Sequence, residues 1–134
     1  MLCREHAAQL RERYDEIRAR GAEVVAIGTG DEQYAARFVA DEDVPFPVLV
    51  DDGAEAARAA AVRGTTPWGL FNPRSFPGAW RARKAGFRVR KSGKRVTQLG
   101  ATFVIGPGNR IGYEHVDAHT ADHAPLDAVF AALP

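Results

Sequence analysis

The chain has 134 residues, 46% of them hydrophobic and 26% charged, which suits one globular domain with a buried core. Its 18 basic and 17 acidic residues nearly balance, so net charge gives no reason to expect nucleic acid or an anionic membrane as the main partner. Because no apolar run reaches membrane-spanning length, no signal-peptide pattern stands at the start and the one cysteine has no internal partner, we predict a cytoplasmic protein with a single domain over residues 1–134.

The first half of the sequence alternates helix and strand patterns. Apolar residues spaced by three and four from Cys3 to Ile17 predict a helix that Gly21 ends. The β-branched run EVVAIG at 23–28 predicts a parallel strand covered on both faces. A helix, a strand and a short helix are expected next, at residues 31–43, 46–52 and 54–62.

The second half begins with an irregular stretch and ends with a hairpin and a helix. The segment ATFVIGPGNRIGYEHV at 101–116 predicts two antiparallel strands around a turn of Gly and Asn. An apolar stripe that includes Val129 and Phe130 predicts a last helix, which Pro125 starts. This order indicates an α/β fold, a mixed sheet flanked by helices, although no strand precedes the first helix.

A basic insertion occupies about residues 64–98. It carries nine of the eighteen basic residues and no acidic one, with Trp and Phe interleaved. We favour an insertion whose aromatic side chains pack back on the domain, because no nucleic-acid-binding motif is present and no specific nucleic acid is expected. The alternative is an anionic surface or another partner bound through residues 74–95.

Two other motifs are interpreted as structural. The segment IGTGDEQ lacks the third glycine of a dinucleotide-binding fingerprint, and we expect Thr29 or Asp31 to cap the following helix instead. The segment HVDAHTADH gathers potential metal ligands without a recognised ligand spacing. Its titratable residues are His115, Asp117, His119, Asp122 and His123. We predict neither a metal site nor a bound cofactor.

Three segments together resemble a known family. They are CREHAAQLRERYDEIRARGAEVVAIG, VPFPVLVDD and QLGATFVIGPGNRIGYEHVDAHTADHAP, and they are similar to the peroxiredoxin-like branch of the alkyl hydroperoxide reductase/thiol-specific antioxidant (AhpC/TSA) family. The resemblance implies a thioredoxin-like fold. It also implies the strand order 46–51, 23–28, a central strand missing from this chain, 101–106 and 111–116, so the chain looks truncated at its N-terminus.

The resemblance also points to a redox site at the start of the first helix. Members of this branch carry a motif like Cys-Pro-x-Cys-Arg there, and Cys3 and Arg4 match its last two positions. A thiolate at that place is stabilised by the helix N-terminus, with Arg4 adding positive charge. Cys3 thus resembles the second cysteine of that motif, and three interpretations of it stay open: the nucleophile, the resolving residue, or an inert apolar residue on the helix stripe.

The resemblance implies a thiol-dependent antioxidant or redox function. Cys3 and Arg4 would reduce hydroperoxides or exchange disulfides, with an external thiol as reductant and a homo-oligomer as the assembly. The sequence departs from the family where an arginine usually precedes a strand, since Gly100 stands there, and Ala101 replaces the cis-proline of thioredoxins. A non-catalytic relative that binds its partner through residues 74–95 is the alternative.

Overall fold

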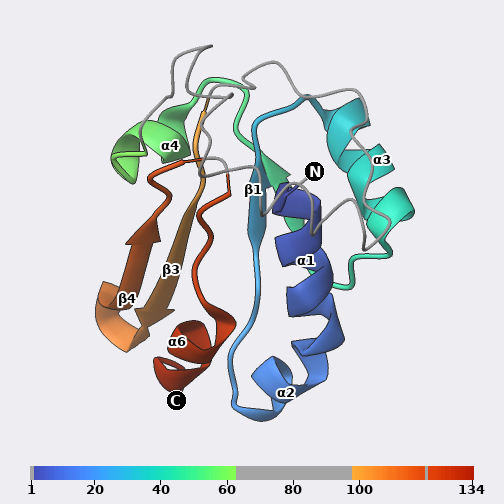
Figure 1. The fold of residues 1–134 in the computed structure, drawn as a ribbon. Helices are drawn as coiled ribbons and strands as arrows, with labels where there is room; N and C mark the ends of the chain where they lie inside the picture. The colour runs from blue at the N-terminus through green and yellow to red at the C-terminus, as the bar shows by residue number, and fades with distance from the viewer. Residues whose placement is uncertain (1, 63–97, 120) are drawn as a thin grey trace.

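The computed structural model of the chain describes residues 2–62, 98–119 and 121–134 (Figure 1). The basic insertion therefore lies almost entirely outside the described residues. The described elements, in chain order, are α1 (Leu2–Glu12), α2 (Tyr14–Ala19), β1 (Ala26–Gly28), α3 (Glu32–Glu42), β2 (Val48–Val50), α4 (Glu55–Ala59), β3 (Ala101–Gly106), a 3₁₀ turn (Pro107–Asn109), β4 (Arg110–Val116) and α6 (Leu126–Ala131). This order confirms the predicted succession of helices, strands and hairpin. None of these described helices has the length and apolar character needed to cross a membrane.

Local sequence signals explain where the helices begin and end. Asp31 caps α3 by accepting a hydrogen bond from the amide of Tyr34 at 2.8 Å, which settles the choice between the two predicted caps. Gly21 ends α2 with a φ of +75°, a conformation that glycine adopts without steric cost. The prediction of one continuous first helix is wrong, because Arg13 has φ −112° and ψ 15° and separates α1 from α2.

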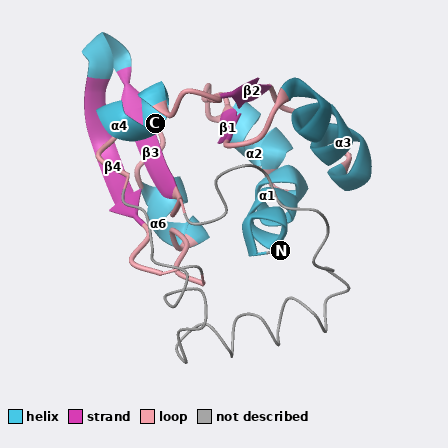
Figure 2. Ribbon diagram, turned by 90° about the horizontal axis from the view of Figure 1, so that it is seen from above, coloured by secondary structure: helices cyan, strands magenta, loops and turns pink. Residues whose placement is uncertain are grey.

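The strands form two separate sheets. β1 and β2 pair in parallel, with Ala26 opposite Val48, and β3 and β4 form the predicted antiparallel hairpin. Within the described residues no strand ladder joins β1 to β3, and Figure 2 shows the two pairs apart. The fold is the thioredoxin-like α/β arrangement without a strand at its centre in the described part of the chain.

One face of the β1–β2 pair is uncovered. Val25, Ile27 and Leu49 are 52%, 55% and 53% exposed, whereas the alternate residues of both strands are less exposed. The prediction that the strand at 23–28 is covered on both faces is therefore wrong. Side chains of successive strand residues point to opposite faces, so the described helices cover only one of them.

The C-terminal segment, residues 117–134 with the exception of residue 120, packs beside α1 and α2. Figure 1 shows it running down between the β3–β4 hairpin and α1. Phe130 is 4% exposed, and the guanidinium of Arg13 lies 3.5 Å from the centre of its ring. Arg20 lies over the same ring and donates a hydrogen bond to the Phe130 carbonyl at 3.1 Å. Phe130 is therefore part of the buried core, to which Ile17 and Leu99 also belong.

Among the described strands, none pairs with the facing edges of β1 and β3, and this predicts self-association because an unpaired strand edge pairs readily with another chain. Size-exclusion chromatography over a range of concentrations is expected to show association of the natural sequence. Ile27→Lys should shift the protein toward monomer, because a charged residue on an edge strand opposes pairing. Val39→Lys is the matched control on α3, where Val39 is 36% exposed, and should associate as before. A natural sequence that stays monomeric at every concentration would contradict this prediction.

Candidate functional site

The candidate site begins at the N-terminus of α1. Cys3 is the second residue of this eleven-residue helix, so the helix starts where the sequence predicts. The side chain of Cys3 lies outside the described residues. The unpaired amides and positive dipole end of the first turn favour a negative charge at this place.

Arg4 points from α1 to α3. Its guanidinium nitrogen Nη1 bonds to Glu42 and lies 3.4 Å from Asp41, while the group sits 5.4 Å from the Phe38 ring centre. Only 10% of the Arg4 side chain and 12% of the Glu42 side chain are exposed. Arg4 is therefore engaged in a largely buried ion pair that joins the start of α1 to the end of α3.

The electrostatics of Arg4 follow from that pairing. Burial by itself would lower the pKa of Arg4, but the hydrogen bond and negative charge of Glu42 outweigh it and the pKa is raised. Two helical turns further along α1, Arg11 donates a hydrogen bond to the Glu42 carbonyl oxygen, so it contacts the same end of α3. Most of the positive charge of Arg4 is thus compensated within the protein.

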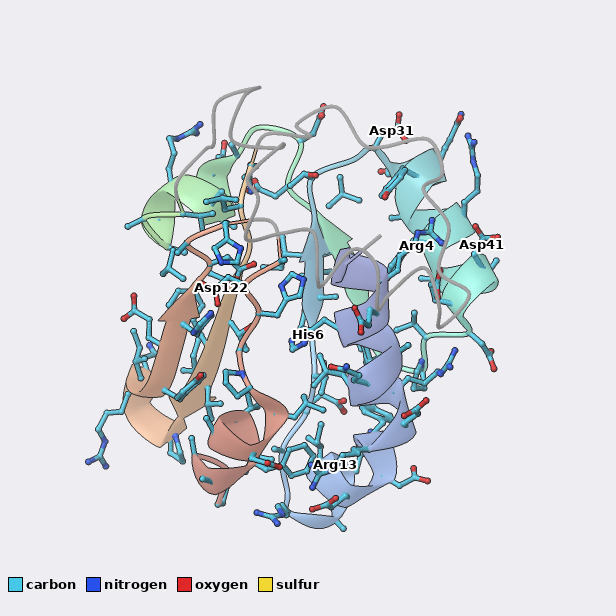
Figure 3. The ribbon with its side chains drawn as sticks, viewed as in Figure 1. Arg4, His6, Arg13, Asp31, Asp41 and Asp122 are labelled. Carbon is cyan, nitrogen blue, oxygen red and sulfur yellow. The ribbon has the colours of Figure 1, made fainter. Side chains whose placement is uncertain are left out.

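A cluster of imidazoles and carboxylates lies on the other side of α1 (Figure 3). The rings of His6 and His123 stack with centres 5.4 Å apart and planes inclined by 28°. Asp117 is 5% exposed, and its Oδ2 atom lies within hydrogen-bond distance of Nδ1 of His123, at 3.1 Å. The Nε2 atoms of both stacked rings are buried, and within the described residues neither has a hydrogen-bond partner.

The cluster continues to the end of β4. Nε2 of His115 lies 3.2 Å from Oδ1 of Asp122, whose other oxygen accepts a hydrogen bond from the Ala118 amide at 2.7 Å. Burial would raise the pKa of Asp122, but the Ala118 hydrogen bond and the imidazoles of His115 and His119 prevail and lower it. This part of the cluster favours an ionised carboxylate.

His6 is the member of the cluster whose protonation is most strongly opposed. Its pKa falls from 6.5 to about 4, first because the ring is buried and then because of the charge on the stacked His123. The charge on His115 acts in the same direction, while Asp117 and Glu5 act in the opposite direction. His6 is therefore neutral at neutral pH, and so the stacked pair holds at most one positive charge.

The carboxylate of Asp117 lies against Gly100, where a larger residue would have a Cβ atom. A Cβ atom at residue 100 would lie 2.6 Å from Oδ2 of Asp117, which is too close for any real contact. The Asp117 amide also donates to the Gly100 carbonyl at 3.0 Å. The residue before β3, where the resemblance leads us to expect an arginine, is thus a glycine beside a buried carboxylate.

The histidines and carboxylates of the segment HVDAHTADH lie close together in pairs. In the part of the chain that the structure describes, no group of three or more His, Cys, Asp or Glu side chains is arranged to hold a metal ion. Two of the residues singled out in HVDAHTADH, His115 and Asp122, lie together, and Asp117 and His123 form a second pair. The basic residues proposed for partner binding, 74–95, lie outside the described residues.

The comparisons with known proteins identify the family. The sequence model described as AhpC/TSA antioxidant enzyme matches residues 9–119, which is most of the chain. The chain belongs to the AhpC/TSA family. The search of curated proteins and the search of solved structures each found no match. In this AhpC/TSA chain the matched region starts after Cys3, Arg4 and His6, so the roles of these three residues rest on their own chemistry.

Sequence reasoning missed two features of this AhpC/TSA protein. It assigned Arg4 to the cysteine next to it, whereas the structure pairs Arg4 with Glu42. It considered the histidines near residue 120 without His6, although His6 lies one helical turn after Cys3 and a histidine near an apolar helix stripe was a usable signal. Neither partner could be chosen from the sequence, because both contacts join distant segments.

Arg4→Met should destabilise this AhpC/TSA protein by roughly 1–3 kcal/mol, because it leaves the largely buried Glu42 carboxylate without its partner. Urea denaturation followed by circular dichroism measures the change. Arg18→Met is the matched control, since it breaks the exposed ion pair with Glu23 and should leave the free energy of unfolding unchanged within error. Equal changes in the free energy of unfolding for the two substitutions would contradict a stabilising role of the Arg4–Glu42 pair.

Proposed function

We propose that the protein is a thiol-dependent redox enzyme that reduces hydroperoxides, or exchanges disulfides, through the thiol of Cys3. The observation that carries this proposal is membership of the AhpC/TSA antioxidant enzyme family over residues 9–119. The start of α1 at Leu2 supports it, because a cysteine in the first turn of an eleven-residue helix is a favourable place for a thiolate.

The peroxide reaction proceeds at the thiolate sulfur. The sulfur forms a bond to the terminal peroxide oxygen, the O–O bond breaks, and the departing alkoxide takes a proton to leave as an alcohol or as water. The cysteine is then a sulfenic acid. A thiol from another molecule attacks that sulfur and releases water to give a mixed disulfide, and a second thiol restores Cys3. The reductant is external because the chain has one cysteine.

Within this proposal Arg4 has a positioning role. Its charge is compensated by Glu42 and Asp41, so its direct effect on a neighbouring thiolate is small. Its ion pair instead holds the first turn of α1 against α3. The helix N-terminus is then the main stabilising influence on the thiolate.

The thiol of Cys3 is expected to have an apparent pKa below about 8.5, the ordinary cysteine value. The rate of alkylation by iodoacetamide against pH measures it without ambiguity, because no other cysteine is present. Cys3→Ser should abolish alkylation and also the consumption of hydrogen peroxide in the presence of dithiothreitol.

An apparent pKa at or above about 8.5 would contradict the activated thiol. Peroxide consumption by Cys3→Ser equal to that of the natural sequence would contradict a role for Cys3. Absence of peroxide and disulfide reduction in both proteins would favour the non-catalytic alternative.

A further inference from the structure

We propose that the stacked rings of His6 and His123 form a proton-sensitive contact that holds the C-terminal segment on α1 when both are neutral and releases it in mild acid. The two rings come from elements far apart in the sequence, α1 and the loop before α6, and meet with centres 5.4 Å apart. This proposal concerns the docking of the segment and does not depend on Cys3.

The stacking contact brings the two imidazole rings together in a buried place. Asp117 lies 3.1 Å from Nδ1 of His123 and is almost fully buried. Protons on both rings would place two positive charges in stacking contact. Like charges repel strongly where water is excluded, and the Nε2 atoms of both rings are buried.

Three other titratable groups act on His6, and they come from α1, β4 and the loop after β4. They are Glu5 on α1, His115 on β4 and Asp117 after β4. Asp117 and Glu5 favour a proton on His6, whereas burial, His123 and His115 oppose it. The opposing influences prevail, since the pKa of His6 falls from 6.5 to about 4. Nε2 of His115 lies 3.2 Å from Asp122 and also 3.7 Å from Asp117, so His115 contacts the same carboxylate as His123.

The sign of the effect follows from proton linkage. When the segment leaves α1, His6 reaches water and regains its ordinary pKa, so the released state binds a proton more tightly than the docked state. Docking is therefore strongest above about pH 6.5 and weakens as the pH falls toward 4. Between pH 7.5 and pH 5 the released fraction should rise about 30-fold.

Acid should act on one end of the segment only. The other end is held by Arg13 and Arg20 around Phe130, and arginine keeps its charge throughout this pH range. The Asp117 amide, which bonds to the Gly100 carbonyl, reports opening near the histidines. The Ala35 amide, which donates to the Asp31 carbonyl oxygen at the start of α3, reports a region away from the histidines.

Hydrogen exchange of the full chain at pH 7.5 and pH 5, corrected for intrinsic rates, tests the proposal. The protection factor at Asp117 should fall about 30-fold while that at Ala35 stays constant. His6→Phe keeps a stacked ring that cannot take a proton and should abolish the fall. His119→Gln, the matched control outside the stack, should retain it. His6→Gln provides a second neutral variant if His6→Phe does not fold.

A protection factor at Asp117 that is independent of pH in the natural sequence would overturn the proposal. So would an equal fall at Asp117 and Ala35, because global unfolding would then explain the loss. An unchanged fall in a folded variant without His6 would assign the pH dependence to another group.

Discussion

The packing of the C-terminal segment against α1 and α2 is the constraint on which the rest of the described structure depends. The two sheets share no strand ladder within the described residues, so their strands do not hold each other in place. The buried ring of Phe130 between Arg13 and Arg20 provides apolar burial together with cation–π attraction. The His6–His123 stack fixes the other end of the same segment. Figure 3 shows His6 and Arg13, one residue from each contact, at different heights of the first helices.

This packing also determines the character of the candidate site. One side of α1 faces α3 through the Arg4–Glu42 pair, and the other side faces the imidazole cluster. Both sides are thus occupied by protein groups, and the charge of Arg4 is compensated. The start of α1 is left as the place where an added negative charge is favoured, which is the property that the proposed thiolate chemistry needs.

Much of the fold could be predicted from the sequence because its signals are local. The Asp31 cap, the Gly21 stop and the hairpin at 101–116 each depend on residues within a few positions of one another. The break at Arg13 could not be predicted from helix periodicity, because the spacing of apolar residues continues through it. The exposure of Ile27 was missed for a related reason, since an apolar run does not specify which elements cover it.

The candidate site was predicted less completely than the fold. Cys3 was placed correctly at a helix start, and its chemistry stays a prediction. The partner of Arg4 and the meeting of His6 with His123 depend on how α1 packs against α3 and the C-terminal segment, which no short motif encodes. The resemblance to the AhpC/TSA family was confirmed because it rests on several segments spread along the chain.

The most direct test of this account is the stability of Phe130→Ala against Ile105→Ala, measured by urea denaturation. Phe130 is 4% exposed and Ile105 is 64% exposed. If packing of the C-terminal segment holds the structure together, Phe130→Ala costs about 3–5 kcal/mol of unfolding free energy. Ile105→Ala then changes it by no more than about 0.5 kcal/mol. Similar small losses for both substitutions would contradict the central role of this contact.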